Sequence, residues 1–327
     1  MINVSRVQED GYPMFADLPP LGETGERHAW DVWGRDDQLG SLNWLRPEKV
    51  RAACQLVRTG EVIGLGCSLN QPDPGPFTHR SPYRHVVDRG RQGRDDRIDG
   101  LYLQYGSQWD GLRHIRFREY GYWGGRQEED LDSTDDLGID HWARRGLIGR
   151  GVLLDMVQHT ADRGGALMPT SRQAFSPDFL DEVADAEGVE FQGGDILLIR
   201  TGWMEWYLDL APEARGAMQG RVGARDEPLA SPGLDARQNT AAWLWDHRIA
   251  AVSSDNLALE VLPVRREEGF LHFRIIPLLG MPVGEMWILG ELAAACKKSG
   301  RYDFLLASGV LNVPNGVGSP ANAYAVL

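Results

Sequence analysis

Two short, continuously apolar runs constrain the fold of this chain more than any other feature. They are GVLLDMV (151–157) and DILLIRT (195–201). Runs of this length and character are typical of strands that are buried on both faces of a sheet. Between them, Ser176 and Pro177 predict the N-cap and the first position of a helix that extends to Ala186. A strand, a helix and a strand in this order predict an α/β sheet.

The same alternation continues along the rest of the chain. Further helices are predicted over 47–59, 138–145, 236–247 and 285–298, and further strands over 61–69, 101–117 and 250–256. Residues 1–45 are expected to form an irregular arm, and the polar stretches 70–99 and 128–136 are expected to be loops. No repeat of 20–50 residues and no compositional linker divides the chain, so we expect one mixed α/β domain over residues 1–327.

Charge and cysteine content exclude several classes of protein. The 327 residues include 34 Lys and Arg against 47 Asp and Glu, a formal net charge of −13. This balance argues against a protein that binds nucleic acid or an anionic membrane through broad positive charge. The three cysteines are widely separated, so neither a disulfide framework nor a thiolate zinc site is expected. With no signal-like or membrane-spanning apolar segment, we expect a cytoplasmic protein with a small-molecule substrate.

The densest cluster of polar groups that could do chemistry is QYGSQWDGLRH, at 104–114. No GxGxxG, GxxxxGK[ST] or GxSxG motif competes with it. On an extended strand Gln104, Gln108 and Asp110 would share one face, because their separations are even. A bend at the following glycine would bring His114 back over that face. This combination of groups can hold a hard metal ion or serve as an acid/base site.

A second cluster lies in HFRIIPLLGMPVGEMW (272–287), which contains His272 and Glu285. Two glycines and two prolines between these residues give the chain room to fold both side chains into one cavity. A His–carboxylate pair fits either a metal ligand set or a general acid/base couple. Glu285 also has a structural interpretation as a first-turn residue of the predicted helix, where the helix dipole favours a carboxylate.

The residues of the first cluster have structural interpretations too. Asp110 could cap a turn, His114 could be a hydrogen-bonded core histidine, and Gln104 and Gln108 could brace a strand. Trp109 could be a core residue or the wall of a pocket for a flat, ring-bearing substrate. We assign Gln104, Gln108 and Trp109 to substrate binding. Further along the chain, Asp255 and Asn256 are interpreted as capping or turn residues.

Taken together, the two clusters resemble the cyclase family of metal-dependent hydrolases, which includes bacterial kynurenine formamidase, isatin hydrolase and some polyketide cyclases. The hallmark of that family is HxGTHxDxPxH, followed far downstream by a His and then a Glu. Here QYGSQWDGLRH occupies the first motif, and His272 with Glu285 occupies the second. The segments WGRDDQLGSLNWL (33–45) and SSDNLALEVLP (253–263) add to the resemblance, which covers nearly the whole chain.

The resemblance implies a swivelling β/β/α fold, with a mixed sheet flanked by helices, and a homodimer or homotetramer. It implies that Asp110, His272 and Glu285 are metal ligands or acid/base partners, and that His114 is an acid/base residue. The two histidines that bind metal in the formamidases fall on Gln104 and Gln108. Because neutral amides bind borderline metals more weakly than imidazole does, Mn²⁺ or Mg²⁺ in place of Zn²⁺, or no metal at all, becomes credible. We include Gln108 among the predicted ligands.

The function implied by the resemblance is hydrolysis of an amide, lactam or lactone bond in a small aromatic molecule. A metal-activated water would attack, and His114 would move the proton. One alternative is a cyclase or dehydratase for a polyketide-like substrate, which would use the same groups without net addition of water and without requiring a metal. Another is a small-molecule binding protein without catalysis. The two glutamines favour that last reading, whereas the retention of four ionisable groups argues against it.

Overall fold

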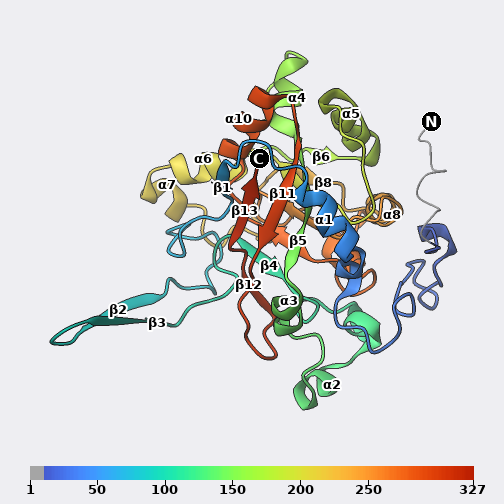
Figure 1. Cartoon of the computed structure of the whole chain (residues 1–327), viewed down its shortest axis with the longest axis horizontal. Coiled ribbons are helices and arrows are strands. Elements are labelled where there is room, and N and C mark those ends of the chain that lie inside the picture. The colour runs from blue at the N-terminus through green and yellow to red at the C-terminus, as the bar shows by residue number, and fades with distance from the viewer. Residues whose placement is uncertain (1–10) are drawn as a thin grey trace.

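The computed structural model describes residues 11–327 and centres on one large mixed sheet (Figure 1). Within these residues its strands are β1 (Val62–Gly64), β4 (Gln108–Asp110), β5 (Leu147–Asp155), β7 (Ile196–Arg200), β9 (Ala251–Ser254), β10 (Val283–Glu285), β11 (Asp303–Ser308), β12 (Gly318–Pro320) and β13 (Ala323–Val326). Their order across the sheet is β1-β13-β11-β5-β7-β9-β10-β4-β12. The four strands β5, β7, β9 and β10 run parallel, and the other pairings are antiparallel.

The two apolar runs of the sequence form β5 and β7 in the middle of this sheet. They pair in parallel, from Gly151 opposite Ile196 to Asp155 opposite Arg200. The Val, Leu and Ile side chains at their centres are fully buried, as expected for strands covered on both faces. The predicted α/β class, with a mixed sheet flanked by helices, is confirmed.

Helices surround the sheet (Figure 1). They are α1 (Pro47–Cys54), α2 (Glu128–Ser133), α3 (Ile139–Arg145), α4 (Met156–Asp162), α5 (Pro177–Glu187), α6 (Trp203–Asp209), α7 (Pro212–Gly216), α8 (Gln238–Asp246), α9 (Leu271–Ile275) and α10 (Gly290–Ser299). Helix α5 starts as predicted, since the Ser176 side chain accepts a hydrogen bond from the Phe179 N–H and Pro177 is the first helical residue. Among the described residues, no helix combines the length and the apolar character needed to cross a membrane.

Several element predictions are wrong. The helix predicted over 285–298 starts only at Gly290, because Glu285 is paired within β10. The predicted loop 128–136 contains α2, which a reciprocal capping box between Gln127 and Asp130 stabilises. The predicted strand 101–117 is extended only at β4, because the chain turns on either side of it.

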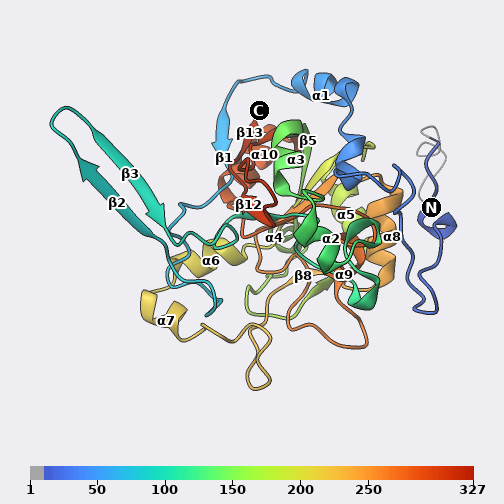
Figure 2. The same ribbon diagram turned by 90° about the horizontal axis from the view of Figure 1, so that it is seen from below.

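The predicted loop 70–99 contains a hairpin of β2 (Arg84–Arg89) and β3 (Arg94–Asp99). It projects away from the rest of the molecule in both views (Figures 1 and 2). Nearly all of its side chains are exposed, so the alternation of buried and exposed residues that would reveal a strand in the sequence is missing. A further two-stranded pairing joins β6 (Ala174–Phe175) to β8 (Gly233–Leu234).

The large sheet curls until its ends meet. Strand β12 is one edge of the sheet and β13 lies next to the other edge, yet only Ala321 and Asn322 separate them in the chain. Three peptide units span at most about 11 Å, so the two ends must be neighbours. Hydrogen bonds close the gap, from Cys67 N to Ser107 Oγ at 2.9 Å and from Ile288 N to Leu65 O at 2.9 Å. Strands β4 and β10, which carry residues of the candidate site, lie close to the edge strand β12 at which the sheet closes.

Residues 11–45 form 3-10 turns and loops that pack onto the body, with the Trp44 ring tilted against that of Trp245 of α8. Gly40 has a φ of +58°, and a Cβ on it would lie 1.9 Å from the carbonyl oxygen of Gly280. Ser41 N also donates to this oxygen, at 2.9 Å. The irregular segment therefore fixes the connection between α9 and β10, which carry the two residues of the second sequence cluster.

Candidate active site

The neighbouring strands β4 and β10 bring the side chains of Gln108, Asp110 and Glu285 together. In the antiparallel pair β4–β10, Gln108 lies opposite Glu285 and Asp110 lies opposite Val283. The alternation of the strand places Gln108 and Asp110 on the same face, as predicted. The Gln108 Nε2 donates to Glu285 Oε2 at 2.7 Å and to Asp110 Oδ1 at 3.3 Å. The amide therefore links the two carboxylates.

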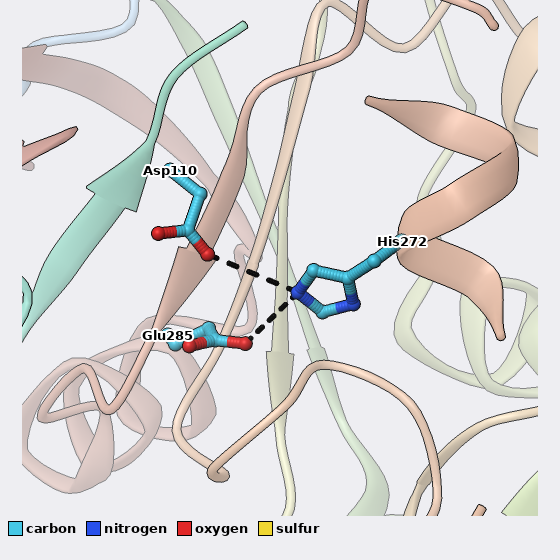
Figure 3. A group of neighbouring side chains, drawn as sticks. All are labelled: Asp110, His272 and Glu285. Carbon is cyan, nitrogen blue, oxygen red and sulfur yellow. Dashed lines mark hydrogen bonds and ion pairs between the residues drawn. The ribbon is translucent and has the colours of Figure 1, made fainter. Parts of the chain in front are cut away.

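His272 enters the same cluster from α9. Its Nε2 lies 3.0 Å from Glu285 Oε1 and 3.8 Å from Asp110 Oδ2 (Figure 3). All three residues are buried, and one ligand atom from each lies within 4.8 Å of the others. The chain thus brings its two sequence clusters, more than 150 residues apart, into one site.

The donor set of this site fits a divalent cation. Asp110 Oδ2 is buried and has no hydrogen-bond partner among the described residues. A buried carboxylate oxygen without a donor is costly unless a cation or water satisfies it. Two carboxylates and one imidazole are ordinary ligands for Mn²⁺, Zn²⁺ and related ions. The group of Asp110, His272 and Glu285 can therefore hold a divalent metal ion.

Gln104 reaches the site from a turn rather than from a strand. Its Nε2 donates to Asp110 Oδ1 and lies 3.0 Å from His114 Nδ1. The backbone turns before β4 because Gly106 packs tightly on Gln71, where a Cβ would lie 2.5 Å from the Gln71 carbonyl oxygen. The expectation that Gln104 lies on an extended strand is wrong, but its side chain still converges with those of Gln108 and Asp110.

The two glutamines act as hydrogen-bond donors to the carboxylates. The amide nitrogen of each faces Asp110, and the Oε1 of Gln108 accepts a 3.4 Å hydrogen bond from Arg80 Nη1. Ligation of a metal by the Gln108 oxygen, which faces Arg80 here, stays a prediction.

Glu260, for which sequence analysis predicted no role, is also a member of the site. Its Oε2 lies 2.7 Å from His272 Nδ1, and the residue is fully buried. It belongs to the segment SSDNLALEVLP, which entered the resemblance without a role for any residue. A carboxylate in an otherwise apolar run, ALEVLP, was the available signal, because an unpaired carboxylate is rarely fully buried. A carboxylate on the far nitrogen of a metal-binding histidine fixes the ring and its tautomer.

The pKa values of His272 and Glu285 both lie above their ordinary values. Burial by itself lowers the pKa of His272, but Glu260 and Glu285 outweigh it and hold that pKa well above its ordinary value. Burial and the Asp110 charge raise the pKa of Glu285 to about 7, although His272 lowers it. The site therefore attracts positive charge strongly, whether from a proton or from a metal ion.

His114 stands over the cluster, after the bend that follows Asp110. Its Nε2 lies 3.6 Å from Asp110 Oδ2. Burial lowers the His114 pKa, the Asp110 charge opposes that effect, and His272 and Arg80 lower the pKa further. The net shift is downward, so the ring is neutral at pH 7 and can accept a proton. The predicted return of His114 over the face of Asp110 is confirmed.

A cavity of about 490 Å³ opens onto His114, His272 and Glu285. Its other walls are mainly apolar, with one cationic side chain; they include Phe77, Arg80, Ile115, Leu257, Leu262, Val264 and Phe270. None of these seven residues was predicted, because they come from loops whose places depend on the whole fold. A concave, mostly apolar space with a few polar groups is what binds small molecules.

Trp109 and Asp255 are structural residues. Trp109 points to the opposite face of β4 from Asp110, is fully buried, and donates from Nε1 to Ser308 Oγ at 2.9 Å. The expectation that Trp109 binds substrate is therefore wrong. Asp255 accepts from Thr201 N, Thr201 Oγ1 and Gly202 N at the start of α6, and burial raises its pKa to about 6. Its interpretation as a capping residue is confirmed, and Asn256 braces the adjoining turn through Pro232 O at 2.7 Å.

Comparisons with known proteins agree with this geometry. A family model described as "Putative cyclase" matches residues 42–261. The crystal structure of a novel cyclase is 31% identical and has a TM-score of 0.79, over 92% of this chain and 99% of that one. An isatin hydrolase bound to the product analogue thioisatinate is 15% identical, with a TM-score of 0.58 over 82% of this chain and 92% of that one. Isatin hydrolase A from Labrenzia aggregata, bound to benzyl benzoate, is 16% identical, with a TM-score of 0.57 over 87% and 98%. The last two share the fold. None of the curated proteins compared with the chain matches it.

Proposed function

This chain belongs to the cyclase family, and from that premise we propose that it hydrolyses an amide, lactam or lactone bond in a small aromatic molecule. The observation that carries the proposal is the convergence of Asp110, His272 and Glu285, with a buried Asp110 oxygen that has no hydrogen-bond partner within residues 11–327. The isatin hydrolases that share the fold are named for the hydrolysis of a cyclic aromatic amide, which supports the same class of reaction here.

Asp110, His272 and Glu285 would hold a divalent metal ion. Such an ion lowers the pKa of a bound water and polarises a carbonyl group. The chain's own groups prepare this site. Glu260 fixes the His272 ring through Nδ1, so that Nε2 faces Asp110 and Glu285. The Gln108 amide nitrogen donates to Asp110 and to Glu285, and so holds the two carboxylates in place.

The Asp110–His114 pair would carry the proton. The Gln104 amide donates to His114 Nδ1, and in a neutral ring this leaves the proton on Nε2, beside Asp110. The attacking water would give its proton to the Asp110 carboxylate, and His114 Nε2–H would give one to the departing nitrogen or oxygen. Transfer of the Asp110 proton to Nε2 would then restore both groups. Proton transfer by a positioned histidine contributes about 10²- to 10⁴-fold to a rate.

The Gln104 and Gln108 amides favour one alternative. They donate to Asp110 and Glu285 directly, which is how a site without a metal would stabilise two neighbouring carboxylates. A cyclase or dehydratase for a polyketide-like substrate could then use His272 with Glu285 as its acid/base couple, with no net addition of water.

Metal analysis and turnover separate the two proposals. Protein purified without chelator is analysed for bound metals, beside Asp110→Asn and the control Asp162→Asn, which lies on the exposed side of α4. Each protein is then screened against aryl amides, lactams and lactones, before and after EDTA treatment. We expect stoichiometric metal in the wild type and the control, its loss in Asp110→Asn, and hydrolysis that EDTA abolishes and added Mn²⁺ or Zn²⁺ restores. Full metal occupancy in Asp110→Asn would refute Asp110 as a ligand. Turnover that EDTA leaves unchanged would favour the metal-free alternative.

A further inference from the structure

Arg80 is the one arginine or lysine among the described residues that line the cavity, and the proposed hydrolysis assigns it no contact with the substrate. It lines the cavity beside His114, His272 and Glu285. Its Nη1 donates to the backbone oxygen of Gln104 and, at 3.4 Å, to Gln108 Oε1. Its guanidinium also lies over the Phe77 ring, 4.6 Å from the ring centroid. These contacts fix the plane of the guanidinium at the wall of the cavity.

The N–H groups on Nε and Nη2 of Arg80 are available to a ligand. Among residues 11–327, no acceptor lies within hydrogen-bonding distance of Nε or Nη2, and no carboxylate forms an ion pair with the guanidinium. The arginine is only partly buried and belongs to the wall of the cavity. Both of its protein acceptors are neutral, so its charge is not matched by a direct partner.

The cavity residues around Arg80 indicate what kind of ligand could pair with its charge. Most of the residues near Arg80 in the cavity are apolar, among them Phe77, Leu262 and Phe270. An anionic group is the natural partner of a fixed guanidinium, whose planar fork matches the two oxygens of a carboxylate. The apolar walls would cover a ring or an alkyl body.

We propose that Arg80 binds a carboxylate of the substrate, so that the substrate is an aromatic amide, lactam or lactone that also carries an acidic group. That this ligand is a substrate rests on the proposed hydrolytic function, whereas the binding of an aromatic carboxylate at Arg80 does not. Arg80 is then a specificity-determining residue. It orients the ring so that the bond to be cleaved faces His114 and the Asp110–His272–Glu285 group.

A binding experiment tests the recognition without any need for turnover. The probes are benzoate, phenylacetate and 3-phenylpropanoate, each paired with its neutral primary amide, and affinities are measured by calorimetry. The proteins are the full-length wild type, Arg80→Gln, Arg80→Lys, and the control Arg84→Gln on the exposed hairpin strand β2. Each is measured as purified and after EDTA treatment, because a bound metal could itself hold a carboxylate.

We expect at least one carboxylate to bind the wild type and Arg84→Gln about 10- to 100-fold more tightly than its amide, in both metal states. In Arg80→Gln this preference disappears while the affinity for the amide stays the same, and Arg80→Lys retains part of it. The inference is overturned if the wild type does not prefer carboxylates. It is also overturned if Arg80→Gln keeps the preference, or if carboxylate and amide lose affinity equally, since an equal loss indicates a structural role.

An activity experiment separates the failure of this inference from the failure of the proposed function. N-formyl-3-aminobenzoic acid and its methyl ester, which differ in one charge, are compared as amide substrates. We expect Arg80→Gln to lower kcat/KM for the acid about 10- to 100-fold more than kcat/KM for the ester, and the difference to lie mainly in KM. Equal loss for both substrates overturns the inference. If the wild type hydrolyses no amide or lactone at all, the proposed function fails, and the calorimetry alone decides the role of Arg80.

Discussion

Replacing Glu260 by glutamine tests the architecture of the candidate metal centre without touching a proposed ligand. The substitution preserves the size of the side chain and removes one negative charge. In the wild type Glu260 Oε2 lies 2.7 Å from His272 Nδ1, and the opposite ring nitrogen lies 3.0 Å from Glu285. Since the Glu260–His272 contact is fully buried, water cannot replace it and salt screens it little.

The expected size of the effect follows from the charges of the site. Glu260→Gln removes one of the three carboxylates, those of Glu260, Asp110 and Glu285, that surround His272 in this site. Loss of a carboxylate behind a metal-binding histidine typically lowers metal affinity about 10- to 100-fold, which is about 1.4–2.8 kcal/mol. We expect the upper half of that range, because the site is buried.

The assay is calorimetric titration of Mn²⁺ or Zn²⁺ into EDTA-treated, dialysed protein. Glu205→Gln is the control, because Glu205 pairs with Arg200 away from the cavity. Measurement in two buffers of different ionisation enthalpy also counts the protons released. We expect the wild type to release a proton from His272 on binding near neutral pH, since Glu260 and Glu285 raise its pKa. Glu260→Gln should release less, because its ring is already less protonated.

Stability of the metal-free protein gives an independent check, with a defined sign. A histidine whose folded pKa is raised stabilises the fold fully below its unfolded value of 6.5 and loses that contribution as the pH rises through the folded pKa. The Tm difference between EDTA-treated wild type and Glu260→Gln should therefore be largest below pH 6.5 and shrink at higher pH. A folded Glu260→Gln protein that binds metal within about twofold of the wild type would refute the reasoning, since loss of the carboxylate behind a metal-binding histidine typically lowers metal affinity tenfold or more.

Three further predictions concern catalysis, the N-terminal segment and the hairpin. His114→Ala should lower kcat about 10²- to 10⁴-fold with little change in KM. In the wild type, the acid limb of the pH–rate profile should lie below pH 6.5, because burial lowers the His114 pKa. Gly40→Ala should cost more stability in urea unfolding than Gly60→Ala. Both glycines have positive φ, which costs about 1–2 kcal/mol for alanine, but only Gly40 would also meet the Gly280 carbonyl, whereas nothing lies within 4 Å of a Cβ on Gly60. Replacing residues 85–98 of the hairpin by two glycines should leave the Tm near the wild-type value, because these side chains are largely exposed. Light scattering on the same variant tests whether the predicted homodimer or homotetramer depends on the hairpin.

Local chemistry explains which elements could be predicted from the sequence. The runs that form β5 and β7 are apolar throughout, and the start of α5 carries Ser176 and Pro177, so each signal lies within the element itself. The hairpin 84–99 gave no such signal, because neither of its faces is buried. The helix predicted from Glu285 failed for the opposite reason. Pairing with β4 and β9 holds residues 283–285 extended, and those partners are distant in the chain.

The same distinction applies to the site. The spacing of Gln108 and Asp110 placed them on one face of a strand, and the glycine after Asp110 allowed His114 to return over it. Trp109 was misassigned although the same alternation places it on the opposite face of the strand from Asp110, and the structure shows that this face meets the core. Its neighbours Ser308 and Trp287 come from the far end of the chain.

The sequence by itself determined the α/β class, the family resemblance, and the four ionisable residues Asp110, His114, His272 and Glu285. Each of these depends on the chemistry of a residue and on its spacing from near neighbours. Only the tertiary structure decided that Glu260 holds His272, that Gln104 and Gln108 present amide nitrogens to the carboxylates, and that Arg80 stands in an apolar wall. Hydrogen-bond partners and unmatched charge depend on distances between loops, which the closure of the curled sheet sets and which no local pattern of residues encodes.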